Sequence, residues 1–120
     1  DLHLSLRRQR QMCIRDSLSK LEHRYRVLLY HRPEGADDAS DWGINLMVSG
    51  HTHRGQIFPF NYLVKRIHPR LHGSFDVGDL RLYVSPGTGT WGPILRTNAR
   101  CEVTHFQFLG DPVIQSPNLT

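Results

Sequence analysis

Residues 45–56 have the sequence Asn-Leu-Met-Val-Ser-Gly-His-Thr-His-Arg-Gly-Gln, in which an apolar run leads into a glycine and then two histidines. The apolar run is typical of a buried strand, and Gly50 is typical of a sharp turn at its end. His51 and His53 are two positions apart, so beyond such a turn their imidazoles can point toward two different ions. Neutral imidazole binds Zn, Fe, Ni and Mn. The stretch therefore predicts a strand that ends in ligands for divalent metals.

A second apolar run without helical period, residues 26–30, predicts another buried strand, and His31 follows it directly. In open α/β sheets, ligands bind beyond the carboxyl ends of the strands. If the two strands are neighbours, His31, His51 and His53 meet at one edge of the sheet.

Each histidine also has a simpler explanation. A His-x-His pair often arises by chance in a chain with eight histidines. His31 alone is more often a hydrogen-bonded residue at a strand end than a ligand. We interpret the other histidines downstream as structural or surface residues: His68, His72 and His105.

The rest of the chain predicts a small α/β domain in which strands dominate. Residues 34–42 are polar and predict a loop or a short helix, whereas residues 57–71 show no clear period and predict irregular structure with at most one helical turn. Residues 73–85 predict a hairpin with Leu80, Leu82 and Val84 on one face. A glycine-rich loop is expected at 86–93, and the alternation at 101–108 predicts a last strand.

Residues 1–17 are expected to be foreign to the domain. The run from Arg7 to Asp16 resembles the in-frame translation of a transposase sequencing adapter. Such scars are set aside before fold reasoning. The alternative is a genuine basic arm that binds nucleic acid or membranes. We expect the domain to occupy residues 18–109, with 110–120 as a tail, and we expect N-terminal sequence of the parent protein to be missing.

Composition excludes some functions. Without residues 1–17 the formal net charge falls from +4 to +2, which argues against a nucleic-acid binder that depends on phosphate contacts. Cys101 is then alone, so the redox compartment cannot be read from an internal disulfide. No apolar run reaches the length of about 18 residues that predicts a transmembrane helix.

Three segments carry a more specific signal together. They are Gly-His-Thr-His-Arg-Gly-Gln-Ile-Phe-Pro at 50–59, the strand that precedes His31-x-Pro33, and Leu-Tyr-Val-Ser-Pro-Gly-Thr-Gly at 82–89. In this combination the chain resembles the calcineurin-like metallophosphoesterases. The branch it is most similar to is bacterial and membrane-associated, with a Gly-His-Thr-His-x-Gly-Gln signature. The resemblance covers roughly residues 25 to 108.

The resemblance implies the C-terminal half of a two-layered β-sandwich flanked by helices, with two divalent metal ions (Mn, Zn, Fe or Ni). His31 and His51 would bind one ion and His53 the other. The family's Asp-x-His, Gly-Asp-x-x-Asp and Gly-Asn-His motifs are absent from residues 18–120. Asp1-Leu2-His3 has the letters of the first motif but lies in the adapter-like segment. Catalytic residues therefore stay unassigned, and we expect the isolated chain to be inactive.

The resemblance also implies what the parent protein does. It would hydrolyse phosphate ester or pyrophosphate bonds with a metal-activated hydroxide, on a phosphorylated small molecule or a lipid-linked substrate. No nucleic-acid partner is expected. Membrane association would come through the missing N-terminal region, with the parent at the bacterial inner membrane. Two other classes stay open: a non-catalytic scaffold of the same fold that binds proteins, and a small module that binds one zinc through the three histidines.

Four residues are candidates for binding the phosphate of a substrate. Arg54 and Arg96 carry guanidinium groups that match phosphate geometry, and Gly87 and Gly89 lie in a loop whose N–H groups can face an anion. Ordinary surface arginines and a tight turn explain them equally well or better. The apolar residues at 58–63 are expected to pack in the core, with an acyl or lipid pocket as the alternative.

Overall fold

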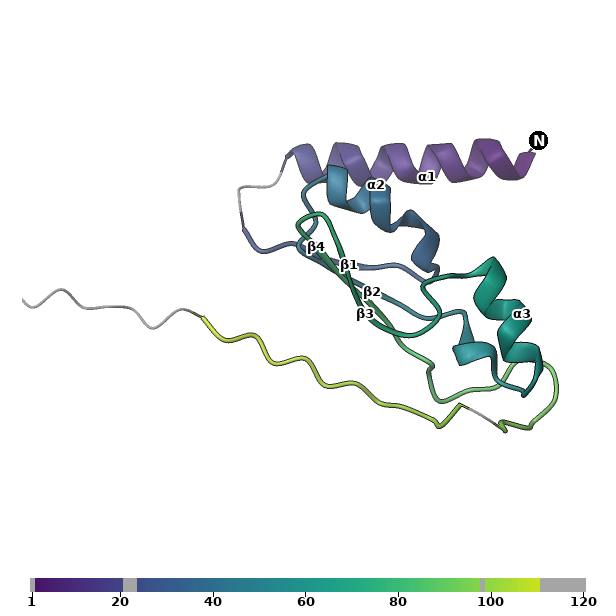
Figure 1. Ribbon diagram of the computed structural model, residues 1–120. Coiled ribbons are helices and arrows are strands. Elements are labelled where there is room, and N and C mark those ends of the chain that lie inside the picture. Colours follow the sequence, from purple (N-terminus) through teal and green to yellow (C-terminus); the bar gives the residue numbers. More distant parts are fainter. Residues whose placement is uncertain (1, 21–23, 98, 111–120) are drawn as a thin grey trace, which may run out of the picture.

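A four-stranded sheet is the centre of this computed structural model, which describes residues 2–20, 24–97 and 99–110 (Figure 1). The strand order is β1-β2-β4-β3. The strands are β1 (Val27–Leu29), β2 (Leu46–Ser49), β3 (Gly73–Val77) and β4 (Leu80–Val84). β1, β2 and β4 run parallel, and β3 pairs antiparallel with β4. Together with its helices the sheet confirms the α/β class.

β2 is the most buried strand because it has a parallel neighbour on each side. Its register pairs Met47 with Leu28 of β1 and with Leu82 of β4. Met47 is fully buried. Strands that are covered on both faces have near-continuous apolar sequences, which explains why residues 44–48 predicted this strand.

The hairpin of β3 and β4 confirms the predicted alternation. Leu80, Leu82 and Val84 are at most 1% exposed, and Arg81 between them points to solvent. Period two in a strand places alternate side chains on opposite faces, so one face of β4 supplies the core. Residues 86–93 form the predicted loop without regular structure.

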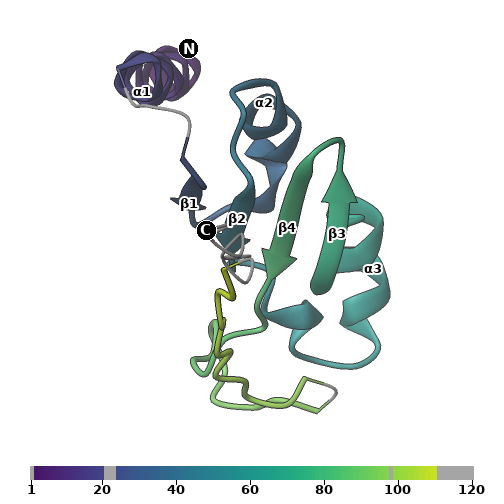
Figure 2. The same cartoon turned by 90° about the vertical axis from the view of Figure 1, so that its left-hand side faces the viewer.

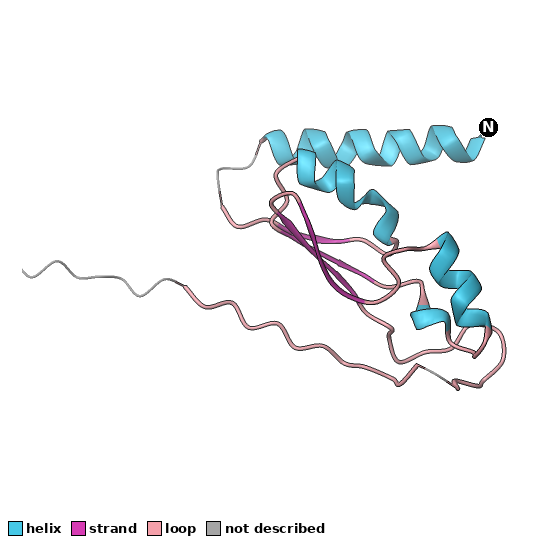
Figure 3. Cartoon of the chain, in the orientation of Figure 1, coloured by secondary structure: helices cyan, strands magenta, loops and turns pink. Residues whose placement is uncertain are grey.

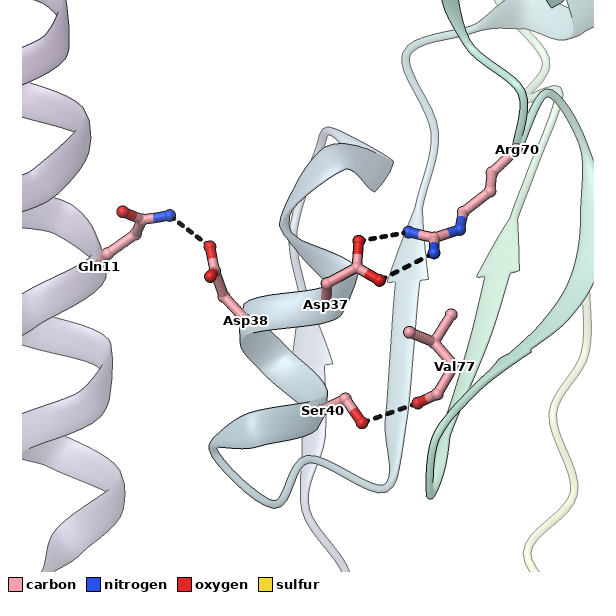
Figure 4. Close-up of polar contacts among 6 residues, drawn as sticks. All are labelled: Gln11, Asp37, Asp38, Ser40, Arg70 and Val77. Carbon is pink, nitrogen blue, oxygen red and sulfur yellow. Dashed lines mark hydrogen bonds and ion pairs between the residues drawn. The ribbon is translucent and has the colours of Figure 1, made fainter.

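Two short helical segments cover the apolar face of the sheet. The 3₁₀ turn η1 (Pro33–Gly35) leads into α2 (Ala36–Asp41), whose Ala36 and Ala39 are fully buried against the core. Figure 4 shows two contacts that hold α2 against the hairpin side of the sheet: Arg70 donates two 2.9 Å hydrogen bonds to the carboxylate of Asp37, and Ser40 Oγ donates one of 2.7 Å to the Val77 carbonyl oxygen.

The opposite face of β4 is covered by a segment without secondary structure. Figure 3 shows residues 99–110 as loop along the sheet. Tyr83 donates a hydrogen bond to Glu102 and lies with its ring centroid 5.3 Å from that of Phe106. The predicted strand at 101–108 is therefore wrong. Alternation is necessary for a strand but not sufficient, because this segment contacts the sheet mainly through side chains rather than through a backbone ladder.

α3 (Phe60–Ile67) corrects a second prediction, because residues 57–71 contain two turns of helix. The overlooked signal is the spacing of Phe60, Leu63, Val64 and Ile67, which repeats at i, i+3, i+4 and i+7 and is typical of one helical face. None of the residues of α3 is buried, and Phe58 before it is exposed. The expectation that this stretch packs as core is also wrong.

α1 (Leu2–Ser19) lies at the margin of the molecule, beyond β1 and alongside α2 (Figure 2). Gln11 Nε2 donates a 2.8 Å hydrogen bond to Asp38 Oδ2, drawn in Figure 4, and Leu18 packs against the core cluster. The remaining described side chains between 12 and 17 are mostly exposed. Among the described residues, no helix has the length and apolar character needed to cross a membrane.

We predict that removing residues 1–17 leaves the sheet intact. The described side chains at 12–17 are mostly exposed, and an exposed contact such as Gln11 with Asp38 contributes little, so the free energy of unfolding should change by less than about 1 kcal/mol. Thermal and urea unfolding followed by circular dichroism measures it. Leu82→Ala is the control, expected to lower the free energy of unfolding by about 2–5 kcal/mol. A loss of that size on deleting residues 1–17 would mean that they belong to the domain.

Candidate metal centre

The carboxyl ends of three parallel strands are joined at one rim of the sheet by backbone hydrogen bonds. The Tyr30 N–H donates to the Val48 carbonyl oxygen at 3.1 Å, and the Gly50 N–H donates to the His31 carbonyl oxygen at 3.0 Å. On the other side, the Ser85 N–H donates to the Ser49 carbonyl oxygen at 2.8 Å. Residues that follow β1 and β2 therefore begin within a few ångströms of each other.

His31 and His51 lie side by side at this rim. His31 Nε2 and His51 Nδ1 are 3.2 Å apart, and the two rings meet edge to face at a centroid distance of 5.0 Å. Two imidazole nitrogens that bind one tetrahedral zinc ion at its usual bond length are about 3.4 Å apart. The spacing of this pair thus fits two ligands of a single divalent ion.

His53 is part of the same rim but has a different neighbour. Its Nδ1 lies 3.3 Å from Nη2 of Arg96, and its backbone begins the 3₁₀ turn η2 (His53–Gly55). Within the described ranges, no three side chains of His, Cys, Asp or Glu are placed to hold one metal ion. Two of the three candidate ligands are thus paired, and the third adjoins them without completing a set.

His68 is a histidine that the sequence analysis left outside the site. It follows the last residue of α3, and its ring centroid is 6.0 Å from that of His51. His68 Nδ1 lies 3.0 Å from Glu34 Oε1. The position of His68 beside His51 depends on how α3 packs against the turn, which the sequence of residues 60–67 does not indicate.

The turn that carries the histidines has unusual backbone angles. His51, His53, Arg54 and Gln56 all have positive φ, between 41° and 71°. A positive φ is uncommon for residues other than glycine, and such residues cluster at functional sites when the surrounding structure holds them in place. Here the side chain of buried Thr52 donates a 2.5 Å hydrogen bond to the carbonyl oxygen of Leu71.

Gly55 lets α3 approach this turn closely. A Cβ at position 55 would lie 2.5 Å from the Cα of Asn61, nearer than real Cβ atoms come to backbone. The φ of Gly55 is also +71°, which disfavours any side chain. The second glycine of the Gly-His-Thr-His-Arg-Gly-Gln segment is therefore required for the contact between η2 and α3.

Gln56 joins the turn to the glycine-rich loop and was not identified from sequence. Its side chain is buried, and Nε2 donates to the carbonyl oxygens of Trp91 and Pro93 at 2.9 and 3.0 Å. Oε1 accepts a 2.6 Å hydrogen bond from the Trp91 N–H. A buried amide whose hydrogen-bonding groups are satisfied fixes the loop against the rim.

Electrostatics at the rim favour a neutral imidazole. Burial lowers the pKa of His51, and the positive charges of Arg32 and His31 lower it further. Metal ions bind imidazole through an unprotonated nitrogen. The surroundings of His51 therefore keep it in the form that a metal ion needs.

The candidate phosphate-binding residues differ in whether their donor groups are already occupied by hydrogen bonds. Arg96 directs its guanidinium at backbone, donating to the carbonyl oxygens of Pro86, Gly87, Gly89, Ala99 and Arg100. The Gly87 N–H donates to Ser85 Oγ at 3.1 Å. Arg54 is exposed and faces a cavity of about 490 Å³ that Arg96 and Arg100 also line.

A pocket of about 380 Å³ opens where the rim, the turn and α3 meet. Its lining combines the four histidines discussed above with apolar side chains of α3 and of the glycine-rich loop, which are Phe60, Val64 and Trp91. An apolar pocket with a few converging polar groups is the usual form of a ligand site. The arrangement can hold a divalent cation on one wall and an organic group on the other.

Comparison with curated proteins identifies relatives of this chain. It is 47% identical over 87 residues to an uncharacterized metallophosphoesterase of Campylobacter jejuni, covering 70% of this chain and 23% of that protein. A Bos taurus transmembrane protein with metallophosphoesterase domain is 42% identical over 65% of this chain and 18% of its own length. An uncharacterized metallophosphoesterase of Bacillus subtilis is 36% identical over 75% of this chain and 33% of its own.

The chain thus spans about a quarter of the length of the first of these relatives. No protein-family model and no solved structure matches it.

We predict that Gln56→Ala loosens the glycine-rich loop. Three hydrogen bonds to the exposed residues Trp91 and Pro93 would be lost, each contributing about 0.5–1.5 kcal/mol. Hydrogen exchange at the Trp91 amide should become faster by about tenfold or more. Thr90→Ala, an exposed neighbouring change, is the control and should leave that exchange unchanged. If the Trp91 amide is equally protected in Gln56→Ala, the Gln56 side chain does not hold the loop.

Proposed function

Because this chain belongs to the metallophosphoesterase family, we propose that it is the C-terminal part of a domain that hydrolyses a phosphate ester or pyrophosphate bond. The family itself implies divalent metal ions. The number of ions, their identity, the reaction and the substrate are our proposals, because the chain spans only a fraction of its relatives.

The observation that carries the proposal is the pairing of His31 with His51. Their nitrogens are 3.2 Å apart, although the residues are 20 positions apart in the chain, and they converge at the strand ends where α/β sheets bind ligands. Burial lowers the pKa of His51, which favours the unprotonated imidazole that a metal ion binds.

We assign His31 and His51 to one divalent ion and His53 to a second. Bound metal ions in such a site polarise a phosphoryl oxygen and lower the pKa of a water molecule. The residues of this chain position the ligands. The hydrogen bond from the Gly50 N–H to the His31 carbonyl oxygen sets the distance between the first two imidazoles, and Arg96 contacts the ring of His53. The carboxylates that such a dinuclear site also needs would come from the parent protein.

Positive charge beside the turn supports binding of a phosphate. Arg54, Arg96 and Arg100 line one cavity adjoining His53, and guanidinium groups pair with phosphate oxygens. Arg96 acts mainly by shaping the loop, since its hydrogen bonds go to backbone carbonyls. Arg54, whose side chain is exposed, is the better candidate for direct contact.

The apolar wall of the pocket supports a substrate with a hydrophobic portion. Phe60, Val64 and Trp91 line the same pocket as the imidazoles, and a hydrophobic portion of a substrate would bury apolar area against them. The Bos taurus relative is named as a transmembrane protein. We therefore propose a lipid-linked phosphate substrate and a parent protein associated with a membrane.

We predict that His51→Ala and His53→Ala, each made in the full-length parent protein, remove most hydrolysis of a generic aryl phosphate ester. Loss of a metal ligand should lower kcat/KM by about a hundredfold or more. His105→Ala is the control, because His105 is exposed and far from the rim in sequence, and it should retain activity. Near-normal turnover in both His51 and His53 variants would refute the ligand assignment.

The isolated chain is predicted to bind metal weakly. Without bridging carboxylates, three imidazoles cannot offset the repulsion between two divalent cations, so equilibrium dialysis against Mn²⁺ or Zn²⁺ should find no tightly bound ion. One tight zinc per chain would instead favour the mononuclear zinc module. His31→Ala should abolish any residual binding, since it removes half of the paired nitrogens.

A further inference from the structure

An unpartnered apolar stripe runs along α3. Phe60, Leu63, Val64 and Ile67 follow each other at helical spacing and therefore share one face. Phe60 and Val64 line the pocket, whereas Leu63 and Ile67 are 52% and 64% exposed. Burying a leucine or isoleucine side chain is favourable by about 1.5–3 kcal/mol, so this face is a costly surface to leave in water.

Two aromatic side chains add to the exposed apolar surface around α3. Phe58 and Tyr62 are 57% and 66% exposed, and their ring centroids are 6.0 Å apart. Tyrosine combines an apolar ring with a polar tip, so it suits a boundary between an apolar and an aqueous phase. The exposed apolar surface thus includes helix residues and the segment that leads into α3.

The charge beside the stripe has one sign. Residues 58–72 contain no Asp or Glu, and they carry Lys65, Arg66 and Arg70. Arg70 is paired with Asp37, whereas Lys65 and Arg66 are exposed and have no recorded ion pair within the described residues. The positively charged side chains of Lys65 and Arg66 beside an apolar face complement a partner whose interior is apolar and whose outer layer is negatively charged.

We propose that α3 docks on an anionic lipid surface, with Leu63 and Ile67 inserted among the acyl chains and Lys65 and Arg66 at the headgroups. An amphipathic helix with basic residues beside its apolar face is the usual form of an interfacial membrane helix. Eight residues give little area alone, so Phe58 and Tyr62 are needed to complete the inserted surface. We name this surface, residues 58–67, the α3 platform.

The α3 platform adjoins the metal pocket directly. Phe60 and Val64 belong to the same helix face as Leu63 and Ile67 but line the pocket with His51 and His68. In Figure 1, α3 stands at the end of the sheet where the loop after β2 emerges. A helix seated at the headgroup level would bring the pocket mouth close to lipid phosphates. Docking itself does not depend on the proposed hydrolysis.

The full chain can be tested by flotation with vesicles of phosphatidylcholine alone or with added phosphatidylglycerol, at low and high salt. Wild type should float with the anionic vesicles, and less at high salt because the headgroup attraction is screened. Leu63→Ser with Ile67→Ser, and separately Lys65→Ser with Arg66→Ser, should each lower the partition coefficient by about tenfold or more. Circular dichroism verifies that both variants fold.

Two matched variants test whether the effect is local. Arg15→Ser with Lys20→Ser removes two exposed charges from the N-terminal part, and Ile94→Ser removes an apolar side chain that is 95% exposed. Both should float like wild type. The proposal fails if wild type does not float, if the α3 variants float unchanged, or if the Arg15 and Lys20 variant loses binding instead.

A further outcome would assign the α3 platform to another occupant. If wild type sediments as a dimer that Leu63→Ser with Ile67→Ser dissociates, and does not float, then a second copy of the chain covers this face and the lipid proposal is overturned. Retained flotation of the chain with His51→Ala would show that docking does not depend on the metal-ligand assignment.

Discussion

The 3.0 Å hydrogen bond from the Gly50 N–H to the His31 carbonyl oxygen is the contact on which the site depends. It extends the parallel pairing of β1 and β2 by one step beyond the strands themselves. Because the bond joins the residues from which His31 and His51 leave the sheet, it brings two imidazoles together from segments that are separated by α2. The pocket, the turn and α3 are all arranged around that junction.

The strands were predictable because their physics is local. Residues 26–30 and 44–48 are apolar runs without helical period, and the alternation of Leu80, Leu82 and Val84 is the pattern that a half-covered strand requires. Where the strands end also followed from sequence, since Gly50 and Pro33 interrupt regular structure. Placing histidines after two neighbouring parallel strands was then enough to predict that His31 and His51 meet.

Other features depend on contacts that no short window contains. Alternation at 101–108 predicted a strand, but the segment finds side-chain partners at Tyr83 rather than a free backbone edge. Gln56 belongs to the recognised signature, but its hydrogen bonds could not be predicted because they go to carbonyl groups about 35 residues away. The position of His68 depends on where α3 ends. The predicted helix was too short because the helical spacing at 60–67 was not recognised. The apolar residues of α3 follow helical spacing, yet none of its residues is buried.

Arg96 combines two properties that a single exchange would separate. Its guanidinium both gathers the carbonyl oxygens of the loop after β4 and places a permanent charge 3.3 Å from His53. A lysine there would keep the charge, yet its three donors cannot reach five acceptors with the fixed fork of a guanidinium. The shape of the loop and the electrostatic potential around the neighbouring imidazole are therefore set by one side chain but by different parts of its chemistry.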